Sequence, residues 1–243
     1  MGQHFLKDEN ISRKIVEELE KCPIKRLVEV GPGGGALTKY LLEIKGIDFK
    51  AVEIDNEKVE FLEKNYPSLK GKIIHESFLE MEKPFDDGFS VVGNFPYNIS
   101  TQIVFKILEW TDSVDCVIGM FQKEVAQRFA AKEGSKVYGV TSVLVQAYFS
   151  VEYLFDVSAT AFNPPPKVES GVIRMLPLQK PVEMKSKEKF FQLVKAAFGQ
   201  RRKTLRNACR GLFEPDVLQK KIFDLRAERL TVKDFAQLSF EMK

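Results

Sequence analysis

The chain has 243 residues, of which 44% are hydrophobic and 29% are charged, which is typical of a globular protein with one large domain or two unequal ones. No apolar run approaches the roughly 18 residues that span a bilayer, and no signal peptide opens the chain, so we expect a cytoplasmic protein without a membrane partner. The net charge is only +3. With two histidines, His4 and His75, a histidine-based metal centre is not expected. The three cysteines, Cys22, Cys116 and Cys209, are widely spaced, which predicts reduced thiols and no zinc site.

The N-terminal region has the pattern of a nucleotide-binding α/β crossover. Asp8 precedes apolar positions at helical spacing from Ile11 to Leu19, so it is expected to cap a helix. An apolar strand is predicted at residues 26–30 and runs directly into the glycine turn 31–35. Residues 36–43 return to helical spacing. Strand, glycine turn and helix in this order predict the first crossover of a mostly parallel sheet.

The glycine turn by itself allows two ligands. Gly31 to Ala36 fits a dinucleotide fingerprint, and it also fits the glycine pattern of S-adenosylmethionine sites. Glu53 ends the next predicted strand, 22 positions after Gly31, where an acid can accept hydrogen bonds from a ribose diol. Pro32 removes one amide from a phosphate cradle. Together with the polar stretch that begins at Asn94, this favours the methyl donor.

The stretch from Asn94 to Tyr97 is where we place the chemistry. It follows a strand-like run at residues 89–93, and Pro96 ends that strand as a stiff turn. The Asn94 amide, the Phe95 carbonyl and the Tyr97 ring then stand together at the carboxyl end of a strand, where open α/β sheets bind ligands. The amide and carbonyl can accept both hydrogens of an exocyclic amine, and the ring can stack on a base. The alternative is an ordinary turn with a buried aromatic residue.

The remaining elements follow from similar patterns. Strands are predicted at 73–75, 115–121 and 170–176, and helices at 100–110, capped by Ser100, and at 123–132. Residues 162–168 read as a rigid proline loop and 177–181 as a linker. From Lys180 onward there are 16 Lys and Arg against 8 Asp and Glu, so this helical segment is basic. The excess predicts a polyanionic partner, with a solvated helical surface as the alternative.

Several motifs in one order resemble the small-subunit ribosomal RNA adenine dimethyltransferases, also called dimethyladenosine transferases. The matching segments are 2–6, 29–33, 52–55, 93–100, 122–125, 138–139, 162–170 and 201–205. The match covers nearly the whole chain. The resemblance implies an α/β fold, with a Rossmann-like S-adenosylmethionine-dependent methyltransferase domain at 1–179 and a small all-helical C-terminal domain at 180–243.

The resemblance also implies the reaction and its residues. Two methyl groups would pass from S-adenosyl-L-methionine to N6 of each of two adjacent adenosines near the 3′ end of small-subunit (16S) rRNA, during ribosome biogenesis. Donor contacts would come from His4, Leu6, Gly31, Gly33, Glu53, Ser77 and Asn94. The family commonly has Asp at the position of Ser77, so either this hydroxyl or the adjacent Glu76 would hold the donor adenine.

We expect the target base to leave its stack and enter the site. The Asn94 side-chain oxygen and the Phe95 carbonyl would accept hydrogen bonds from the amine and favour a pyramidal nitrogen, which needs no strong base. Tyr97 would stack on one face of the base and Phe162 on the other. Candidate contacts to the rRNA backbone are Arg201, Arg202, Lys203, Arg206 and Arg210.

Two other functions remain possible on this fold. The first is a macrolide-resistance methyltransferase, which acts on large-subunit rRNA adenine, and the second is a non-catalytic ribosome assembly factor. The Pro164–Pro166 loop and the segment 201–203 favour the small-subunit group. The expected partner is the rRNA of the assembling 30S particle, and the enzyme is expected to act as a monomer.

Overall fold

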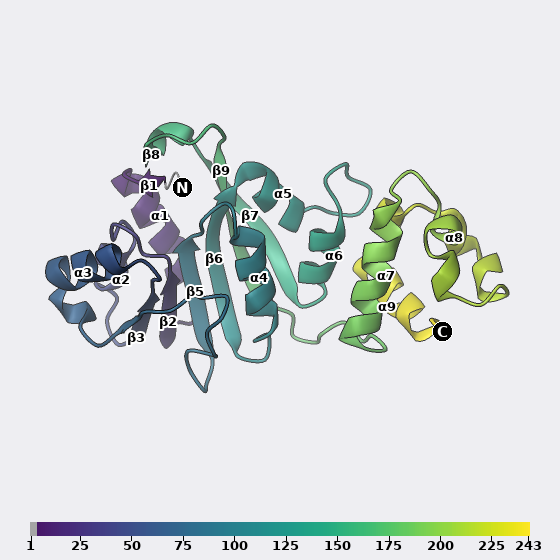
Figure 1. The fold of residues 1–243 in the computed structure, drawn as a ribbon, viewed down its shortest axis with the longest axis horizontal. Helices are drawn as coiled ribbons and strands as arrows, with labels where there is room; N and C mark the ends of the chain where they lie inside the picture. Colours follow the sequence, from purple (N-terminus) through teal and green to yellow (C-terminus); the bar gives the residue numbers. More distant parts are fainter. Residues whose placement is uncertain (1–3) are drawn as a thin grey trace. The chain divides into compact units, whose positions relative to one another are not determined.

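The computed structural model describes residues 4–243, so Gly2 and Gln3 of the first motif lie outside the described part. The chain divides into two compact units, coloured along the sequence in Figure 1. Unit 1 contains the chain up to Ala126 together with Val151–Pro177, and unit 2 contains Gln127–Ser150 and Leu178–Lys243. The break after Pro177 lies near the predicted boundary. Unit 2 is nevertheless larger than the predicted 180–243, because a helix from the middle of the chain packs on the C-terminal helices.

Within residues 4–243, unit 1 is built on a seven-stranded sheet with the order β4-β3-β2-β5-β6-β9-β7. Its strands are β2 (Arg26–Val30), β3 (Asp48–Val52), β4 (Ile73–Ile74), β5 (Phe89–Asn94), β6 (Val114–Gln122), β7 (Phe149–Val157) and β9 (Ser170–Pro177). The first five in spatial order are parallel, and β9 runs antiparallel to β6. Parallel strands are covered on both faces, which explains the continuous apolar runs of β2 and β5.

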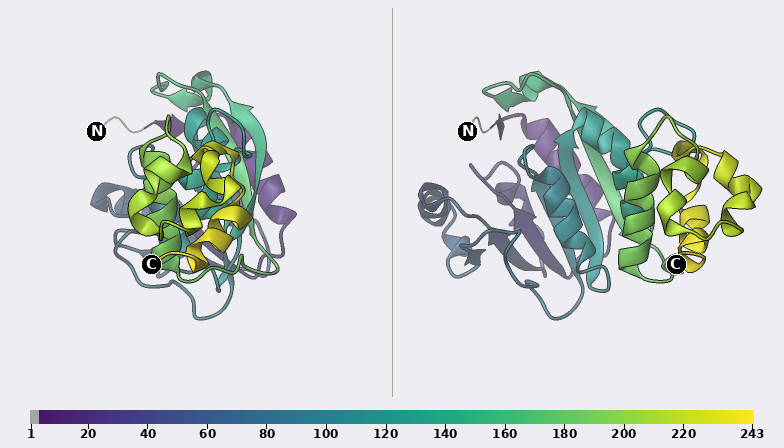
Figure 2. Two further views of the ribbon diagram at one scale, coloured as in Figure 1. Left: turned by 90° about the vertical axis from the view of Figure 1, so that its right-hand side faces the viewer. Right: turned by 45° about the vertical axis from the view of Figure 1, so that its right-hand side comes forward.

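Helices cover both faces of this sheet. They are α1 (Glu9–Glu20), α2 (Thr38–Leu41), α3 (Asn56–Asn65) and α4 (Ser100–Leu108), with short 3₁₀ helices at Pro67–Leu69 and Ala159–Ala161. Helix α5 (Lys123–Phe129) follows β6 and continues into unit 2. Helix α4 lies on one face and α1 on the other (Figures 1 and 2). The mixture of crossover helices and parallel strands confirms the predicted α/β class.

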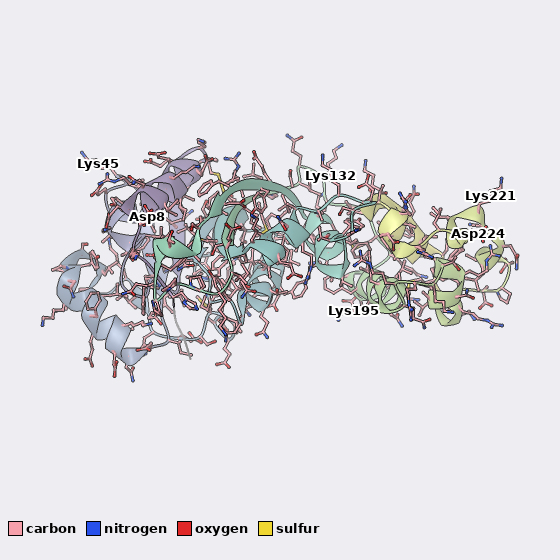
Figure 3. The ribbon with its side chains drawn as sticks, turned by 90° about the horizontal axis from the view of Figure 1, so that it is seen from above. Asp8, Lys45, Lys132, Lys195, Lys221 and Asp224 are labelled. Atoms are coloured by element: carbon pink, nitrogen blue, oxygen red, sulfur yellow. A yellow bond between two sulfur atoms is a disulfide. The ribbon has the colours of Figure 1, made fainter. Side chains whose placement is uncertain are left out.

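The two predicted helix caps have different outcomes. The Asp8 side chain, marked in Figure 3, accepts hydrogen bonds from the backbone N–H groups of Asn10 and Ile11, so this prediction is confirmed. The prediction for Ser100 is wrong. Ile99 is the residue that precedes α4, and the Ser100 hydroxyl donates to the Tyr97 carbonyl at 3.3 Å. Ser100 therefore ties the helix back to the turn that we expected to carry the chemistry.

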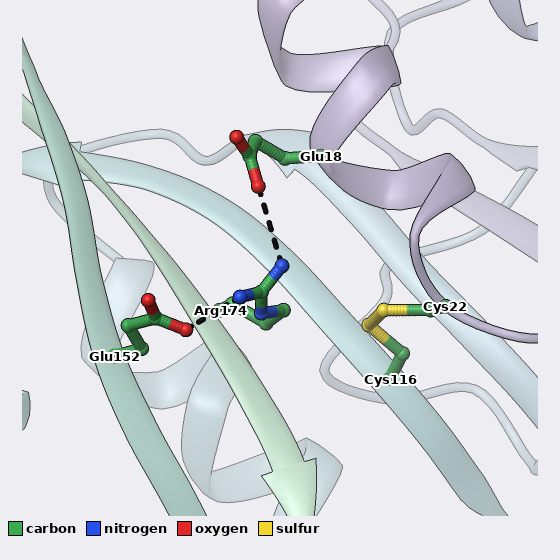
Figure 4. The surroundings of a disulfide bond; sticks show 5 residues. All are labelled: Glu18, Cys22, Cys116, Glu152 and Arg174. Carbon is green, nitrogen blue, oxygen red and sulfur yellow. Dashed lines mark hydrogen bonds and ion pairs between the residues drawn. A yellow bond between two sulfur atoms is a disulfide. The ribbon is translucent and has the colours of Figure 1, made fainter.

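The expectation of three free thiols is also wrong. A disulfide joins Cys22, just after α1, to Cys116 on β6 (Figure 4). Cys209 is free and buried. The two cysteines are separated by 94 positions, but the packing of α1 on the sheet brings their Cα atoms to 6.5 Å. Spacing along the sequence could not indicate this approach. Nearby, Arg174 on β9 donates to Glu18 at 3.2 Å and to Glu152 at 2.5 Å, which joins α1, β9 and β7.

Unit 2 is largely helical. Its helices are α6 (Val140–Gln146), α7 (Lys187–Gly199), α8 (Leu205–Ala208) and α9 (Val232–Phe240), with 3₁₀ helices at Arg210–Leu212, Val217–Gln219, Lys221–Asp224 and Ala227–Arg229. Aromatic side chains fill its core: the Phe213 and Phe223 rings meet edge to face with centroids 4.9 Å apart. Charged side chains such as Lys195 and Lys221 project from its surface (Figure 3). No helix in the described part of the chain is both long and apolar enough to cross a membrane.

Candidate active site

A cavity of about 790 Å³ opens in unit 1 at the carboxyl ends of the parallel strands. This is the edge at which open α/β sheets bind ligands. Its wall contains every predicted donor contact together with the whole stretch from Asn94 to Tyr97. These residues are His4, Leu6, Gly31, Gly33, Glu53, Ser77, Asn94, Phe95, Pro96 and Tyr97. Glu76, the alternative to Ser77, lines the same cavity.

The glycine turn forms the wall at the end of β2. Gly31, Gly33 and Gly35 have φ values of 67°, 56° and 82°, a region that side chains other than glycine rarely adopt. The turn is anchored because the Gly31 N–H donates to the Val52 carbonyl at 2.9 Å. Space is also limited at Gly35, where a Cβ atom would lie only 2.6 Å from the Tyr66 ring. Glycine is therefore required at this position for both backbone angle and volume.

Glu53 faces the glycine turn from the end of β3. Its carboxylate accepts hydrogen bonds from the Gly33 N–H at 3.3 Å, the Ile54 N–H at 2.9 Å and the Asp55 N–H at 3.1 Å. These backbone donors hold the side chain in one orientation toward the cavity, with 6% of its surface exposed. An acid held in this way is suited to accept hydrogen bonds from a ribose diol.

A second acid in the same wall, Glu29, begins the matching segment 29–33, but no role was predicted for it. It is 1% exposed, and its Oε2 accepts a 2.7 Å hydrogen bond from the Thr38 hydroxyl. Burial, reinforced by the nearby Glu53 charge, raises the pKa of Glu29 to about 8 despite that hydrogen bond. An acid within the otherwise apolar run 27–30, two positions before Gly31, is the signal in the sequence that could have identified it.

Strand β1 (Phe5–Leu6) closes another side of the cavity. It pairs antiparallel with β8 (Phe162–Asn163), and the two lie side by side in Figures 1 and 2. The His4 Nδ1 lies 2.8 Å from the Pro164 carbonyl. Phe5 is 40% exposed, lines the cavity, and has the Lys58 ammonium 4.6 Å from its ring centroid. The N-terminal motif and the proline loop thus form one structure beside the glycine turn.

The stretch from Asn94 to Tyr97 leaves β5 as predicted. Within residues 4–243 the Asn94 carboxamide makes no hydrogen bond, and it is partly exposed to the cavity. The Phe95 N–H donates to the Met120 carbonyl at 3.2 Å, while the Phe95 ring is 1% exposed and packs against Phe121. The Phe95 side chain is therefore a core residue, and only its backbone is available to a ligand. The carboxamide and the glycine turn line one continuous space.

Tyr97 and Phe162, which we expected to enclose the target base, have different environments. The Tyr97 ring lines the cavity with its centroid 6.0 Å from that of His4, and its hydroxyl lies 2.6 Å from Ser170 Oγ. Phe162 is 0% exposed, is outside the cavity wall and packs in the hydrophobic core. We therefore withdraw the stacking role of Phe162. Its pairing with Leu6 in the β1–β8 ribbon turns its side chain into the interior.

The predicted RNA-contacting residues also divide into two groups. The Arg201 guanidinium donates to the carbonyls of Lys136 and Tyr138, so it holds the loop before α6. Arg206 pairs with Asp224 at 2.6 Å. Three others are exposed and have no ion pair within the described part of unit 2, namely Arg202, Lys203 and Arg210. The basic charge that remains available to a partner is thus smaller than the composition suggests.

The sheet order, the reversed strand β9 and a cavity that joins a glycine turn to Asn94 define a Rossmann-like methyltransferase. A family model described as "Ribosomal RNA adenine dimethylase" matches residues 1–242. The chain belongs to this family.

Close relatives extend over nearly the full chain. "Ribosomal RNA small subunit methyltransferase A" of Flavobacterium johnsoniae is 49% identical, with 98% of this chain and 93% of the relative covered. The protein of that name from Cytophaga hutchinsonii is 47% identical, with 98% and 94% covered. Among solved structures, a dimethyladenosine transferase from Plasmodium falciparum superimposes with a TM-score of 0.81 at 25% identity, covering 98% of this chain and 97% of that one. The 23S rRNA methyltransferase ErmE shares the fold, with a TM-score of 0.71, 23% identity, and 96% and 99% covered.

Proposed function

We propose that this methyltransferase dimethylates N6 of two adjacent adenosines near the 3′ end of small-subunit rRNA, with S-adenosyl-L-methionine as the methyl donor. The observation that carries the proposal is the single cavity that contains both the glycine turn with Glu53 and the free carboxamide of Asn94. A donor bound at the turn and a base held at Asn94 would then meet in one space. Membership of the ribosomal RNA adenine dimethylase family supports the same substrate class.

The donor half of the cavity fits S-adenosylmethionine. The buried Glu53 carboxylate, oriented by three backbone N–H groups, is available to the ribose hydroxyls. Ile54, which is 66% exposed and lines the cavity, offers apolar surface to the donor adenine, and Ser77 with Glu76 offers polar atoms at its edge. When bound, the donor supplies an electrophilic methyl carbon on a positively charged sulfur.

The acceptor half of the cavity orients the amine. The Asn94 side-chain oxygen and the Phe95 carbonyl would each accept one hydrogen bond from N6, which draws the nitrogen out of conjugation with the purine and directs its lone pair toward the methyl carbon. No general base is needed because the nitrogen becomes strongly acidic as it is methylated. Tyr97 would stack on the base, an interaction worth about 1–3 kcal/mol. Pro96 makes the turn stiff, so these groups are held in place before the base arrives.

Contacts to the rRNA backbone would come from the helical C-terminal region, 180–243. Arg202, Lys203 and Arg210 are exposed and suited to phosphate oxygens. Arg201 and Arg206 would support this surface indirectly, because each already holds a neighbouring segment. We keep the assembling 30S particle as the proposed partner and a monomer as the proposed functional state.

The test is to map the methylated adenines after incubation of unmethylated small subunits or large subunits with labelled donor. The proposal expects N6,N6-dimethyladenosine at two neighbouring positions near the 3′ end of the small-subunit rRNA. Modification of large subunits alone would favour the macrolide-resistance alternative, and binding without transfer would favour an assembly factor.

A variant at the acceptor site ties the activity to this cavity. Asn94→Ala should reduce transfer by at least about a thousandfold, because positioning of reacting groups contributes several kcal/mol to a barrier. Donor affinity, measured by calorimetry, should change only a few-fold, since the glycine turn and Glu53 are untouched. Near-normal turnover in this variant would exclude the proposed role of Asn94.

A further inference from the structure

Tyr97 is held at both ends. Its backbone belongs to the turn after β5, where its carbonyl accepts a hydrogen bond from the Ser100 hydroxyl at 3.3 Å. Its hydroxyl reaches across to the first residue of β9, with the Tyr97 and Ser170 oxygens 2.6 Å apart. The two residues are 73 positions apart in sequence. A ring attached only by its backbone could swing about the Cα–Cβ bond, whereas a hydrogen bond at the hydroxyl holds the far end of the ring in place.

Ser170 is itself firmly placed. It is 0% exposed and pairs with Gln122 at the end of β6. The residue after β6, Lys123, begins α5; it donates its N–H to the Glu169 carbonyl at 2.9 Å and its ammonium to the Glu169 carboxylate at 2.7 Å. The same ammonium pairs with Asp156 on β7 at 2.8 Å. The start of β9 is thus tied to both neighbouring strands, which fixes the Ser170 hydroxyl.

We propose that Ser170 is a positioning residue for methyl transfer: its hydroxyl holds the far end of the Tyr97 ring in place and so sets where the ring meets the target base. The proposal rests on the proposed function, and it adds a residue from the strand that follows the proline loop. Burial raises the pKa of Tyr97, so the phenol stays protonated at neutral pH and the hydrogen bond persists. The bond acts on the geometry of the ring and does not touch the donor.

The chain offers a matched control. Ser90 on β5 is also 0% exposed and also lies in the central sheet, but its hydroxyl is buried without a hydrogen-bond partner in the described structure. Ser90→Ala removes the same atom as Ser170→Ala without releasing another side chain. Tyr97→Phe removes the same hydrogen bond from its other end and keeps the ring.

The first measurement is steady-state methylation of small subunits, normalised to the concentration of donor-binding sites. Ser170→Ala and Tyr97→Phe should each lower kcat about fivefold, as expected for loss of one hydrogen bond, with KM for the subunit and donor affinity within twofold of wild type. The double variant should also lose about fivefold, because both changes remove one interaction. Ser90→Ala should retain wild-type kinetics. A loss of about 25-fold in the double variant would mean independent effects and would overturn the proposal.

The second measurement needs no methyl transfer. A short RNA that carries 2-aminopurine at the target position reports stacking through fluorescence quenching. Wild type and Ser90→Ala should quench strongly, Tyr97→Ala should not, and Ser170→Ala should show intermediate quenching. Equal quenching by Ser170→Ala and wild type would refute the positioning role even if the enzyme methylates its rRNA. Conversely, loss of quenching in Ser170→Ala would support it even if wild type proved inactive on small subunits.

Discussion

The buried acid Glu29 allows a prediction whose size follows from the structure. In the unfolded chain its carboxyl should titrate near the ordinary value of 4.5, whereas in the folded state its pKa is about 8. Between these values the folded protein holds a proton that the unfolded chain has released. Stability therefore falls as pH rises across this window, by about 1.4 kcal/mol per pH unit. From pH 5 to pH 7 the loss from this one group sums to about 2.5 kcal/mol.

Glu29→Gln removes the titration but keeps the size and an oxygen that can accept from Thr38. The stability of this variant relative to wild type should improve by about 2.5 kcal/mol between pH 5 and pH 7. The assay is urea unfolding at several pH values, followed by the fluorescence of Trp110, the one tryptophan in the chain, which is buried in unit 1. This probe reports the unit that contains Glu29, so unfolding of unit 2 does not obscure the result.

The control is Glu17→Gln, the same chemical change on an exposed position of α1. Its unfolding free energy should follow that of wild type in parallel across the pH range. Parallel curves for Glu29→Gln as well would show that burial does not perturb this carboxyl, and the reasoning from its environment would be refuted.

Two further predictions concern the glycine turn and the basic surface. Gly35→Ala should destabilise unit 1 by about 2–4 kcal/mol and weaken donor binding, because the new side chain would have a φ of 82° and a Cβ atom 2.6 Å from the Tyr66 ring. The control is Gly46→Ala, where φ is 78° but no atom lies within 4 Å of the new Cβ. This variant should lose only about 1 kcal/mol of unfolding free energy in the same assay. Arg202→Ala with Lys203→Ala should weaken subunit binding and lower the slope of log affinity against log salt by about two, as measured by filter binding; an unchanged slope would mean that these side chains are only solvated.

The local order of the chain was predictable from sequence. Residues within a few positions of each other determine where the first strand, the glycine turn and the acid-ending second strand occur. The cavity at Gly31 and Glu53 then follows, because the carboxyl ends of parallel strands meet at one edge of the sheet. Pro96 likewise identified where β5 ends. In these cases backbone preferences and the two-residue period of strands contain the needed information.

Contacts between distant segments were not predictable in the same way. Phe162 has the composition of a stacking residue, but its pairing with Leu6 turns its side chain into the core. The approach of Cys22 to Cys116 depends on how α1 packs on the sheet. The Arg201 guanidinium donates hydrogen bonds to two backbone carbonyls of a loop more than 60 positions earlier in the chain. Each of these outcomes depends on a contact between residues far apart in the sequence, which the pattern of neighbouring residues does not indicate.

The two acids beside the glycine turn show why residue type alone does not define a role. Glu29 and Glu53 both occur at the ends of parallel strands, and both line the cavity. Glu53 accepts hydrogen bonds from three backbone N–H groups, which fix its side chain toward the cavity. Glu29 is enclosed, and the cost of burying its charge outweighs the hydrogen bond from Thr38, so the neutral form is favoured. Two acids in one cavity wall therefore differ in role, because backbone donors orient Glu53 toward the cavity whereas Glu29 is enclosed and only 1% exposed.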